Sequence, residues 1–548
     1  MEKGVIHMEQ QLKSAIALLQ ELKDNNIPID MDESMLLSKQ FESCKSDYLN
    51  SLQKDLLTSK EKLIQEMQEA IKTFDETFTN ATQDIISELN SGAEAKKEAR
   101  SGIFSQKVHK VRSSLLNRMY QNEDARTVYH IFIAIMLIMI LGEMLNTYIS
   151  KGVLIDLSLF TYVFGDIYAV TAFWFLMAGW SFLIVPLVRV IHDYKLTIIS
   201  WLPMYTLMQF IGIIVPCAFC IYRKLPIASG FIITCEFSRM FMKTHSYLRE
   251  KLLFANGENE WATYIPDGLK KKGVTLESLN LPVMDIKDLN TEFRRYCYFF
   301  FAPTLIFRDS YPRIPTPLKF SNIFIGVTNV IGTIFYTFII FQAWCVPYFQ
   351  ESWKESYNLR FILFSWFRTM IPGTMLLILM FFGMLHSWFN MWAEILRFGD
   401  RQFYTDWWNV SNFADYYRKW NIVVHEWLFH YVYQDMLRFS RGKCSQLQCF
   451  FAVFIISALM HELILAVSMQ FFYPILLVMF GGPGVIYTFF SRRDSRFLNV
   501  FVWSMFFVGN GLLVVFYSWE HFARKSMDLT PKYGWKTFFI PHSWGCFE

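Results

Sequence analysis

One histidine occupies an unusual place in this sequence. His461 follows the apolar run CFFAVFIISALM and precedes ELILAVSMQFF, so it is expected to lie deep in an apolar helix. Ser457 and Ser468 would share its helix face. Burial disfavours a charged imidazole, and a neutral imidazole is what a general base requires. The pattern therefore indicates a catalytic base, with a hydrogen-bonded core histidine as the alternative interpretation.

A second group of polar residues lies in RFGDRQFYTDWWNVSNFADYYRKWNIVVHEW, residues 397–427. An aromatic belt at a membrane interface explains the Trp and Tyr residues, but not the acidic and amide residues among them. Arg418, Asn421 and His425 fall at i, i+3 and i+7, which is one stripe of a helix. Such a stripe could hold an anionic group at the membrane surface and continue inward as a polar lining.

The other reactive side chains favour no metal, redox or disulfide chemistry. The nine Cys residues are odd in number and scattered along the chain. Cys217 and Cys220 form a C-x-x-C pair, but within the apolar run IIVPCAFCIY, which favours buried small residues. No spacing of ligands predicts a metal site. The formal charge of +4 predicts no nucleic-acid partner.

Residues 403–409, FYTDWWN, resemble the signature of the sterol and diacylglycerol branch of the membrane-bound O-acyltransferase superfamily. YYRKWNIVVHEW and SALMHE follow at the expected distance. RYCYFFFAPTLIFRDSYPR, residues 295–313, resembles the acyl-CoA:cholesterol acyltransferases, and RTVYHIFIA and VGNGLLVVFYSWE are further likenesses. The resemblance covers residues 120–548. The signature residues are Phe403, Tyr404, Asp406, Trp407, Trp408 and Asn409.

The resemblance implies transfer of a long-chain acyl group from coenzyme A to the 3-hydroxyl of a sterol, in the endoplasmic reticulum membrane. It assigns His461 as the catalytic base and Asn421 as its supporting residue, and places a sterol contact at His130. Acyl-CoA is a substrate, and no cofactor or metal is implied. The expected acyl-CoA contacts are Arg418, Asn421, His425, Tyr433 and Ser457. Three alternatives stay open: transfer to diacylglycerol or another lipid alcohol, a transporter or channel, and an inactive sterol sensor.

Three positions depart from the pattern of the sterol enzymes. Asp415 stands where those enzymes have Asn, and a carboxylate is unhelpful beside phosphates. The Lys of the family before the His-bearing span is not matched, and Arg441 or Lys443 could replace it. The disulfide near the C-terminus of some relatives is not available, because Met527 stands near the place of the partner of Cys546.

The elements that must position these residues are membrane spans. The chain is 53% hydrophobic and 18% aromatic but only 18% charged, and a span needs about 20 mainly apolar residues. We therefore expect an all-α, polytopic acyltransferase domain over residues 128–548, with eight to ten spans and nine as the best estimate. The candidate stretches are 128–148, 168–190, 201–222, 227–247, 321–344, 361–386, 420–437, 447–470, 471–490 and 497–517.

Residues 1–127 form a separate segment that is charged and helical in pattern. Its start lacks the apolar region of a signal peptide, and the Lys and Arg residues of KVHKVRSSLLNR precede the first span, so we expect a cytosolic segment. Apolar residues at alternating threes and fours predict a coiled coil with a partner helix. The resembling enzymes carry a cytosolic oligomerisation segment here, and we expect a homodimer or homotetramer. The alternative is a helix lying on the bilayer. The stripe consists of Ile64, Met67, Ile71, Phe74, Phe78, Ala81, Ile85 and Leu89.

Overall fold

A computed structural model of the chain divides it into two compact units, residues 1–100 and 101–548. The structure describes scattered positions between 13 and 50, then 51–73, 75, 106–254, 284–352, 359–441, 443–488, 495–527 and 534–544. The expected boundary at residue 127 stays a prediction. In the first unit, residues 51–73 are helical, and Ile64, Met67 and Ile71 of the expected heptad stripe are exposed within that unit. The other stripe residues lie outside the described residues.

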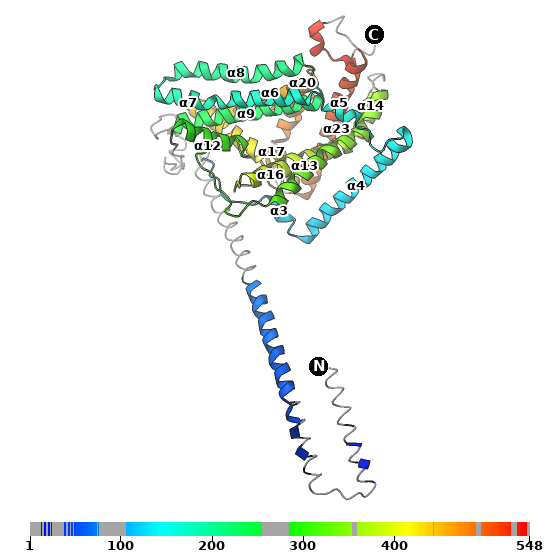
Figure 1. Ribbon diagram of the computed structural model, residues 1–548. Coiled ribbons are helices and arrows are strands. Elements are labelled where there is room, and N and C mark those ends of the chain that lie inside the picture. The colour runs from blue at the N-terminus through cyan, green and yellow to red at the C-terminus, as the bar shows by residue number, and fades with distance from the viewer. Residues whose placement is uncertain are drawn as a thin grey trace. The chain divides into compact units, whose positions relative to one another are not determined.

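The regular secondary structure in the described part of the second unit is helical, apart from two isolated β-bridges. Figure 1 shows α6, α8 and α9 running side by side on one side of this unit, whereas α4 runs along its outside. The helices are α3 (Leu115–Met119), α4 (Glu123–Lys151), α5 (Ser158–Val163), α6 (Ile167–Phe182), α7 (Ile184–Asp193), α8 (Ile198–Tyr222), α9 (Ile227–Phe254), α12 (Leu289–Phe301), α13 (Phe320–Ile340), η2 (Phe341–Cys345), α14 (Val346–Ser352), α15 (Leu359–Met380), η3 (Phe381–Trp388), α16 (Phe389–Ile395), η4 (Trp407–Asn409), α17 (Phe413–Trp420), α18 (Ile422–Leu428), η5 (Phe429–Tyr433), α19 (Gln434–Phe439), α20 (Gln446–Met469), α21 (Ile475–Met479), η6 (Phe480–Gly484), α22 (Val485–Thr488), α23 (Arg496–Ser526), η7 (Gly534–Phe538) and η8 (His542–Trp544).

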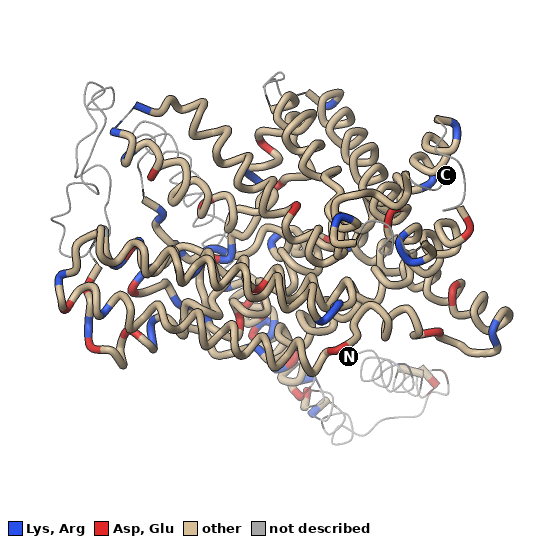
Figure 2. The backbone as a smooth tube through the Cα atoms, turned by 90° about the horizontal axis from the view of Figure 1, so that it is seen from above, with Lys and Arg blue, Asp and Glu red and all other residues tan. Residues whose placement is uncertain are grey.

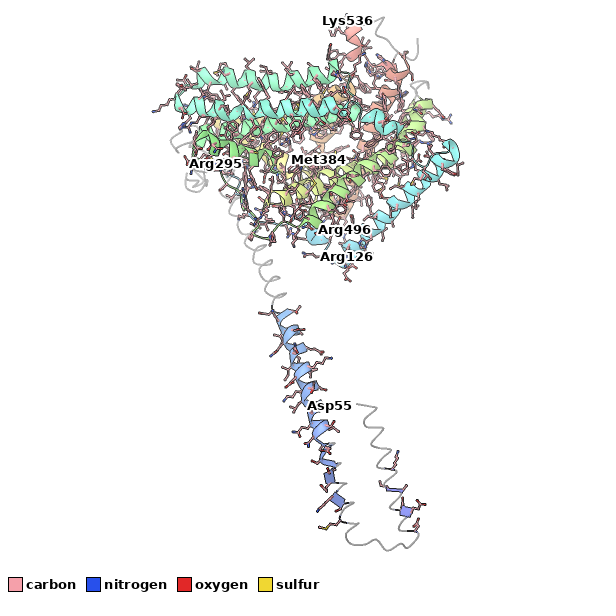
Figure 3. All side chains as sticks on the ribbon, viewed as in Figure 1. Asp55, Arg126, Arg295, Met384, Arg496 and Lys536 are labelled. Carbon is pink, nitrogen blue, oxygen red and sulfur yellow. The ribbon has the colours of Figure 1, made fainter. Side chains whose placement is uncertain are left out.

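Seven helical stretches of the described residues are long and apolar enough to cross a membrane. Long stretches of these helices carry no charged residue (Figure 2). Arg126 and Arg496, at the starts of α4 and α23, lie at one end of the second unit, and Lys536 lies at the opposite end (Figure 3). The spans are Glu123–Lys151, Ser158–Asp193, Ile198–Tyr222, Phe320–Ser352, Leu359–Ile395, Gln446–Met469 and Arg496–Ser526. The chain is therefore an all-helical polytopic membrane protein.

Three of the ten expected stretches are helical but do not meet that criterion. The expected stretch 227–247 is α9, whose many charged residues lower its hydropathy. The stretch 420–437 is divided among α18, η5 and α19. The stretch 471–490 forms a shorter apolar helix, Ile475–Thr488. The seven spans are thus fewer than the expected nine, because an apolar run in the sequence says little about where helices break.

Several charged residues in the second half of α9 are buried, and neighbouring segments supply partners for them. Lys243 donates hydrogen bonds to the carbonyls of Phe299, Phe300 and Ala302, at the C-terminal end of α12. A cation at this end also complements the helix dipole. Arg249 forms a two-point ion pair with Asp435 of α19, with Nη2–Oδ1 at 2.6 Å. These contacts tie α9 to α12 and α19.

Residues before the first span pack against the segment that leads into the signature motif. The Arg112 amide donates to the Gly399 carbonyl at 2.9 Å, and the Arg401 amide donates to the Arg112 carbonyl at 3.0 Å. Lys107 forms ion pairs with Asp400, at 3.8 Å, and with Glu426 of α18. The basic stretch expected to set membrane orientation therefore also has a structural role beside α18.

His109 is buried in the same place. Its Nδ1 lies 3.3 Å from Oδ2 of Asp400, and its ring packs against Tyr311 and Phe398. Burial lowers the pKa of the His109 imidazole below its usual value, although the hydrogen bond with Asp400 acts in the opposite direction. Burial alone would raise the pKa of the Asp400 carboxyl, but His109 and Lys107 hold that pKa below its usual value.

We predict that His109→Gln weakens the acid sensitivity of the fold. Because the folded-state pKa of His109 is lowered, the unfolded chain binds the proton first as pH falls below about 6.5, and stability falls with it. Over one pH unit a single such group contributes at most about 1.4 kcal/mol. Apparent unfolding temperatures in detergent at about pH 7.5 and about pH 5.5 should therefore differ less in the variant. An equal fall in unfolding temperature between the two pH values in variant and wild type would contradict this prediction. His192→Gln, at the end of α7, is the control.

Candidate active site

α20 places His461 in the middle of a membrane-spanning helix. The helix begins at a capping box, in which Ser445 and Gln448 satisfy each other's backbone amides. His461 Nδ1 lies 2.7 Å from the carbonyl oxygen of Ser457. A carbonyl can only accept a hydrogen bond, so Nδ1 carries the proton and Nε2 is the basic nitrogen. The side chain is exposed rather than buried by protein, which corrects the expectation of a buried imidazole: the apolar residues around His461 in sequence do not cover it.

Two aromatic rings connect His461 to α17. The Phe480 ring of η6 stacks on the His461 ring, with centroids 5.7 Å apart. Phe480 also lies 5.8 Å from Tyr417 of α17, which packs edge-on against Phe454 of α20 at 5.2 Å. A Cβ on Gly484 would lie 2.9 Å from the Tyr417 hydroxyl and 3.0 Å from the Met479 carbonyl oxygen, so a larger residue here would displace one of them. α17, η6 and α20 therefore meet beside His461.

Asn421 lies where α17 ends and α18 begins. Its backbone, with φ −136° and ψ 88°, interrupts the helix, and its side chain accepts a hydrogen bond from the Val424 amide at 3.1 Å. The backbone of the signature motif binds both the end of α17 and the start of α18. The Phe403 carbonyl accepts from the Ile422 amide, and the Thr405 amide donates to the Lys419 carbonyl, each at 3.0 Å.

The side chains of the signature motif are mostly structural in their contacts. Phe403, Tyr404 and Trp407 are buried. The Tyr404 hydroxyl binds Nδ1 of His386 at 2.7 Å and the Ser114 hydroxyl at 2.9 Å. Asp406 forms an ion pair with Lys419 at 2.9 Å. The Trp408 carbonyl accepts hydrogen bonds from the side chains of Trp503 and Asn499. Asn409 is exposed. This motif therefore fixes the α17–α18 junction and carries no group placed against His461.

α18 and η5 present a row of rings at a spacing of four residues. His425 stacks on Phe429 at 6.4 Å, and Phe429 stacks on Tyr433 at 5.5 Å. η5 packs against α20, the helix that carries Ser457 and His461. The structure thus brings the helices of these expected acyl-CoA contacts together. Ser468, expected on the His461 face, instead hydrogen-bonds Thr234 of α9 at 3.0 Å and belongs to the helix packing.

Arg418 lies at the surface, with 62% of its side chain exposed, and pairs with Asp415. Partial burial would raise the pKa of the Asp415 carboxyl, but the hydrogen bond from Asn412 and the pair with Arg418 hold that pKa below its usual value. The carboxylate that the sequence comparison set aside is therefore the partner of Arg418. An anionic ligand at Arg418 has to compete with it.

His130 is not brought close to the residues of α20. It is exposed on α4, of whose most apolar stretch only 6% is buried. Its neighbour Tyr129 packs on Phe382 of η3 at 5.9 Å, so the contacts from this part of α4 run toward η3. A sterol contact at His130 stays a prediction.

Three residues of this site were missed by sequence reasoning. Phe480 and Tyr417 were hidden among 55 Phe and 26 Tyr residues, and the signal available was the glycine-rich FGGPG that follows the apolar run. Lys107 had been assigned only to membrane orientation. Among the described residues, no three His, Cys, Asp or Glu side chains group as metal ligands.

Comparison with known proteins places this geometry in a family. Residues 163–519 match the membrane-bound O-acyltransferase family. Sterol O-acyltransferase 1 of Cricetulus griseus is 36% identical over 479 residues, covering 85% of this chain and 83% of the relative. Sterol O-acyltransferase 2 of Homo sapiens is 31% identical over 543 residues, covering 93% and 92%. The resemblance inferred from FYTDWWN is confirmed: the chain belongs to the membrane-bound O-acyltransferase family, in its sterol O-acyltransferase branch.

Proposed function

We propose that this protein transfers a long-chain fatty acyl group from coenzyme A to the 3-hydroxyl of a sterol. Family membership supports the reaction class, and the names of the relatives support the acceptor. The observation that carries the assignment is the hydrogen bond between His461 Nδ1 and the Ser457 carbonyl. It leaves Nε2, on an exposed imidazole within a membrane-spanning helix, as a basic nitrogen.

In the proposed reaction, His461 Nε2 takes the proton of the sterol hydroxyl. The hydroxyl oxygen attacks the thioester carbonyl and forms the new C–O bond. The C–S bond then breaks, and the thiolate of coenzyme A leaves and receives the proton from His461. General-base catalysis supplies about 10²–10⁴ in rate, and positioning of the two substrates supplies much of the remainder. Asn421 is proposed to donate from Nδ2 to the developing oxyanion, since its cap on α18 uses Oδ1.

Acyl-CoA is proposed to enter along α17, α18 and η5. Arg418 lies exposed on α17, where it suits the phosphates of coenzyme A, with Arg441 or Lys443 as a second cation. The apolar chain would then run toward α20, past the expected contacts His425, Tyr433 and Ser457. No cofactor is proposed, since acyl-CoA is consumed.

We propose that the chain crosses the membrane nine times, with two further crossings in addition to the seven spans. α9 and the helical stretch 422–439 are long enough to cross most of the bilayer, at about 1.5 Å per residue, and protein partners cover their polar groups. The proposed location is the endoplasmic reticulum membrane, with residues 1–127 cytosolic. The proposed assembly is a homodimer or homotetramer.

Diacylglycerol or another lipid alcohol is the alternative acceptor. Labelled oleoyl-CoA would be given to membranes from cells without their own acyltransferases, together with cholesterol or diacylglycerol. Cholesteryl ester as the main product supports the proposal. If triacylglycerol is the main product, the acceptor is diacylglycerol and the sterol proposal is wrong.

We predict that His461→Ala lowers ester formation by about 10²–10⁴, because the variant has no group to take the hydroxyl proton. Expression and elution on size exclusion should match the wild type. His521→Ala, near the end of α23, is the matched control and should stay active. If the His461→Ala protein is nearly as active as wild type, His461 is not the base. If it fails to fold, the interpretation as a structural histidine is favoured.

We predict that Arg418→Ala raises the KM for acyl-CoA about tenfold, while the KM for sterol changes little. A charge-assisted contact contributes about 1.5–3 kcal/mol, and we take the lower end because this side chain is exposed. Asp415→Asn removes the competing carboxylate, so the KM for acyl-CoA should fall. If neither variant changes the dependence of the rate on acyl-CoA, Arg418 serves only as an interfacial anchor.

We predict that deletion of residues 1–100 lowers the assembly mass but preserves most specific activity. The stripe residues Ile64, Met67 and Ile71 are exposed within their own unit, and burying apolar surface favours association by about 25 cal/mol per Å². The deletion keeps Lys107 and its contacts with Asp400 and Glu426. Mass would be measured by light scattering after size exclusion in detergent. An unchanged mass would place the subunit contacts between membrane helices.

A further inference from the structure

Glu462 is a buried carboxylate directly after His461 in the sequence, with 3% of its surface exposed. Its Oε2 accepts a hydrogen bond from the Leu477 amide at 3.1 Å, and its Oε1 accepts from the Tyr517 hydroxyl at 3.4 Å. The Tyr517 oxygen in turn accepts from the Leu476 amide at 3.4 Å. One carboxylate on α20 therefore joins the start of α21 and the middle of α23.

These contacts satisfy both the Glu462 side chain and the backbone amides at the start of α21. A polar group at membrane depth is costly unless protein groups satisfy it. The first amides of a helix have no partner within that helix, and a short helix such as Ile475–Thr488 is marginal by itself. Glu462 and Tyr517 satisfy the amides of Leu477 and Leu476, so they hold the start of this helix in place.

The helix held in this way carries Phe480, whose ring stacks on His461 at 5.7 Å and 21°. The chain of contacts therefore starts on α20 at Glu462, passes through Leu477 to Phe480, and returns to α20 at His461. The Phe480 ring also packs against Tyr417, with centroids 5.8 Å apart. The imidazole is thus confined between the Ser457 carbonyl and the Phe480 ring.

We infer that Glu462 is a positioning residue for the proposed reaction: it anchors the helix that holds the Phe480 ring against the His461 imidazole. The inference rests on the proposed role of His461 as base. Glu462 does not act as a direct orienter, because its oxygens are occupied by Leu477 and Tyr517 and because it lies about 100° around the helix from His461. Its effect on the imidazole passes through Phe480.

A double-mutant cycle with Glu462→Ala and Phe480→Ala tests this pathway. Each single variant should lower kcat about tenfold, because a displaced ring frees the imidazole to leave its productive orientation. The KM for acyl-CoA should stay within about twofold, because Arg418 and α18 are untouched. The double variant should be no slower than the slower single variant, because both changes remove the same support. Glu462→Gln should recover to within about threefold of wild type, because its amide oxygen can still accept from Leu477.

Two results would overturn the inference. In one, the losses in kcat multiply to about a hundredfold in the double variant. In the other, the Glu462→Ala enzyme keeps the kcat of wild type. Should Glu462→Ala fail to accumulate, Tyr517→Phe replaces it in the cycle, with a smaller loss and the same expected non-additivity with Phe480→Ala. Glu520→Gln is the control, since this buried carboxylate, about one turn beyond Tyr517 on α23, binds the amides of His542 and Ser543 and not the start of α21. If His461→Ala is itself active, the base assignment fails instead.

Discussion

The constraint on which this structure depends is that polar groups at membrane depth need protein partners. Water is not available there, so each buried charge or backbone amide has to be paired within the chain. On the spanning helix α20, Glu462 meets the start of α21. On α9, for which a membrane crossing is proposed, Lys243 meets three carbonyls at the end of α12 and Arg249 meets Asp435. Each pairing joins two helices at a defined register, whereas apolar contacts alone would tolerate sliding. These polar residues therefore determine how the helices are arranged around His461.

The same constraint explains why the signature motif contributes little direct chemistry. Its backbone satisfies the Ile422 amide and the Lys419 carbonyl, groups that are left over where α17 gives way to α18. Its buried rings fill the space around that break, with Trp407 and Trp420 packed edge-on at 4.7 Å. On the α17 side of the break Arg418 is exposed, and on the α18 side His425 stacks on Phe429. The motif thus makes a break in a helix stable.

Sequence reasoning identified the helical class, the membrane spans with strongly apolar sequences, and the signature residues, because hydropathy and short motifs are local properties. Seven of the expected spans are long and apolar enough among the described residues, whereas α9 and the stretch 422–439 stay proposed spans. The sequence does not show which partners the charges of α9 have, and the break at Asn421 depends on Phe403 and Thr405, which are not adjacent to it in sequence. The roles of Phe480, Tyr417 and Lys107 could not be predicted, since each depends on contacts between distant segments. The assigned roles of His461, Asn421, Arg418 and the other site residues are still predictions that need activity measurements.

A catalytic imidazole inside a membrane domain has two opposed requirements. It has to be open to both substrates, and it has to be held in one orientation without water or many neighbours to hold it. His461, the proposed base, is exposed, and its support comes from the Ser457 carbonyl and the ring of Phe480. A carboxylate bound directly to Nδ1 would also orient the ring, but it would bring a charge into an apolar site, at considerable cost. A backbone carbonyl and an aromatic face achieve the orientation with neutral groups, while the nearby carboxylate of Glu462 is satisfied elsewhere.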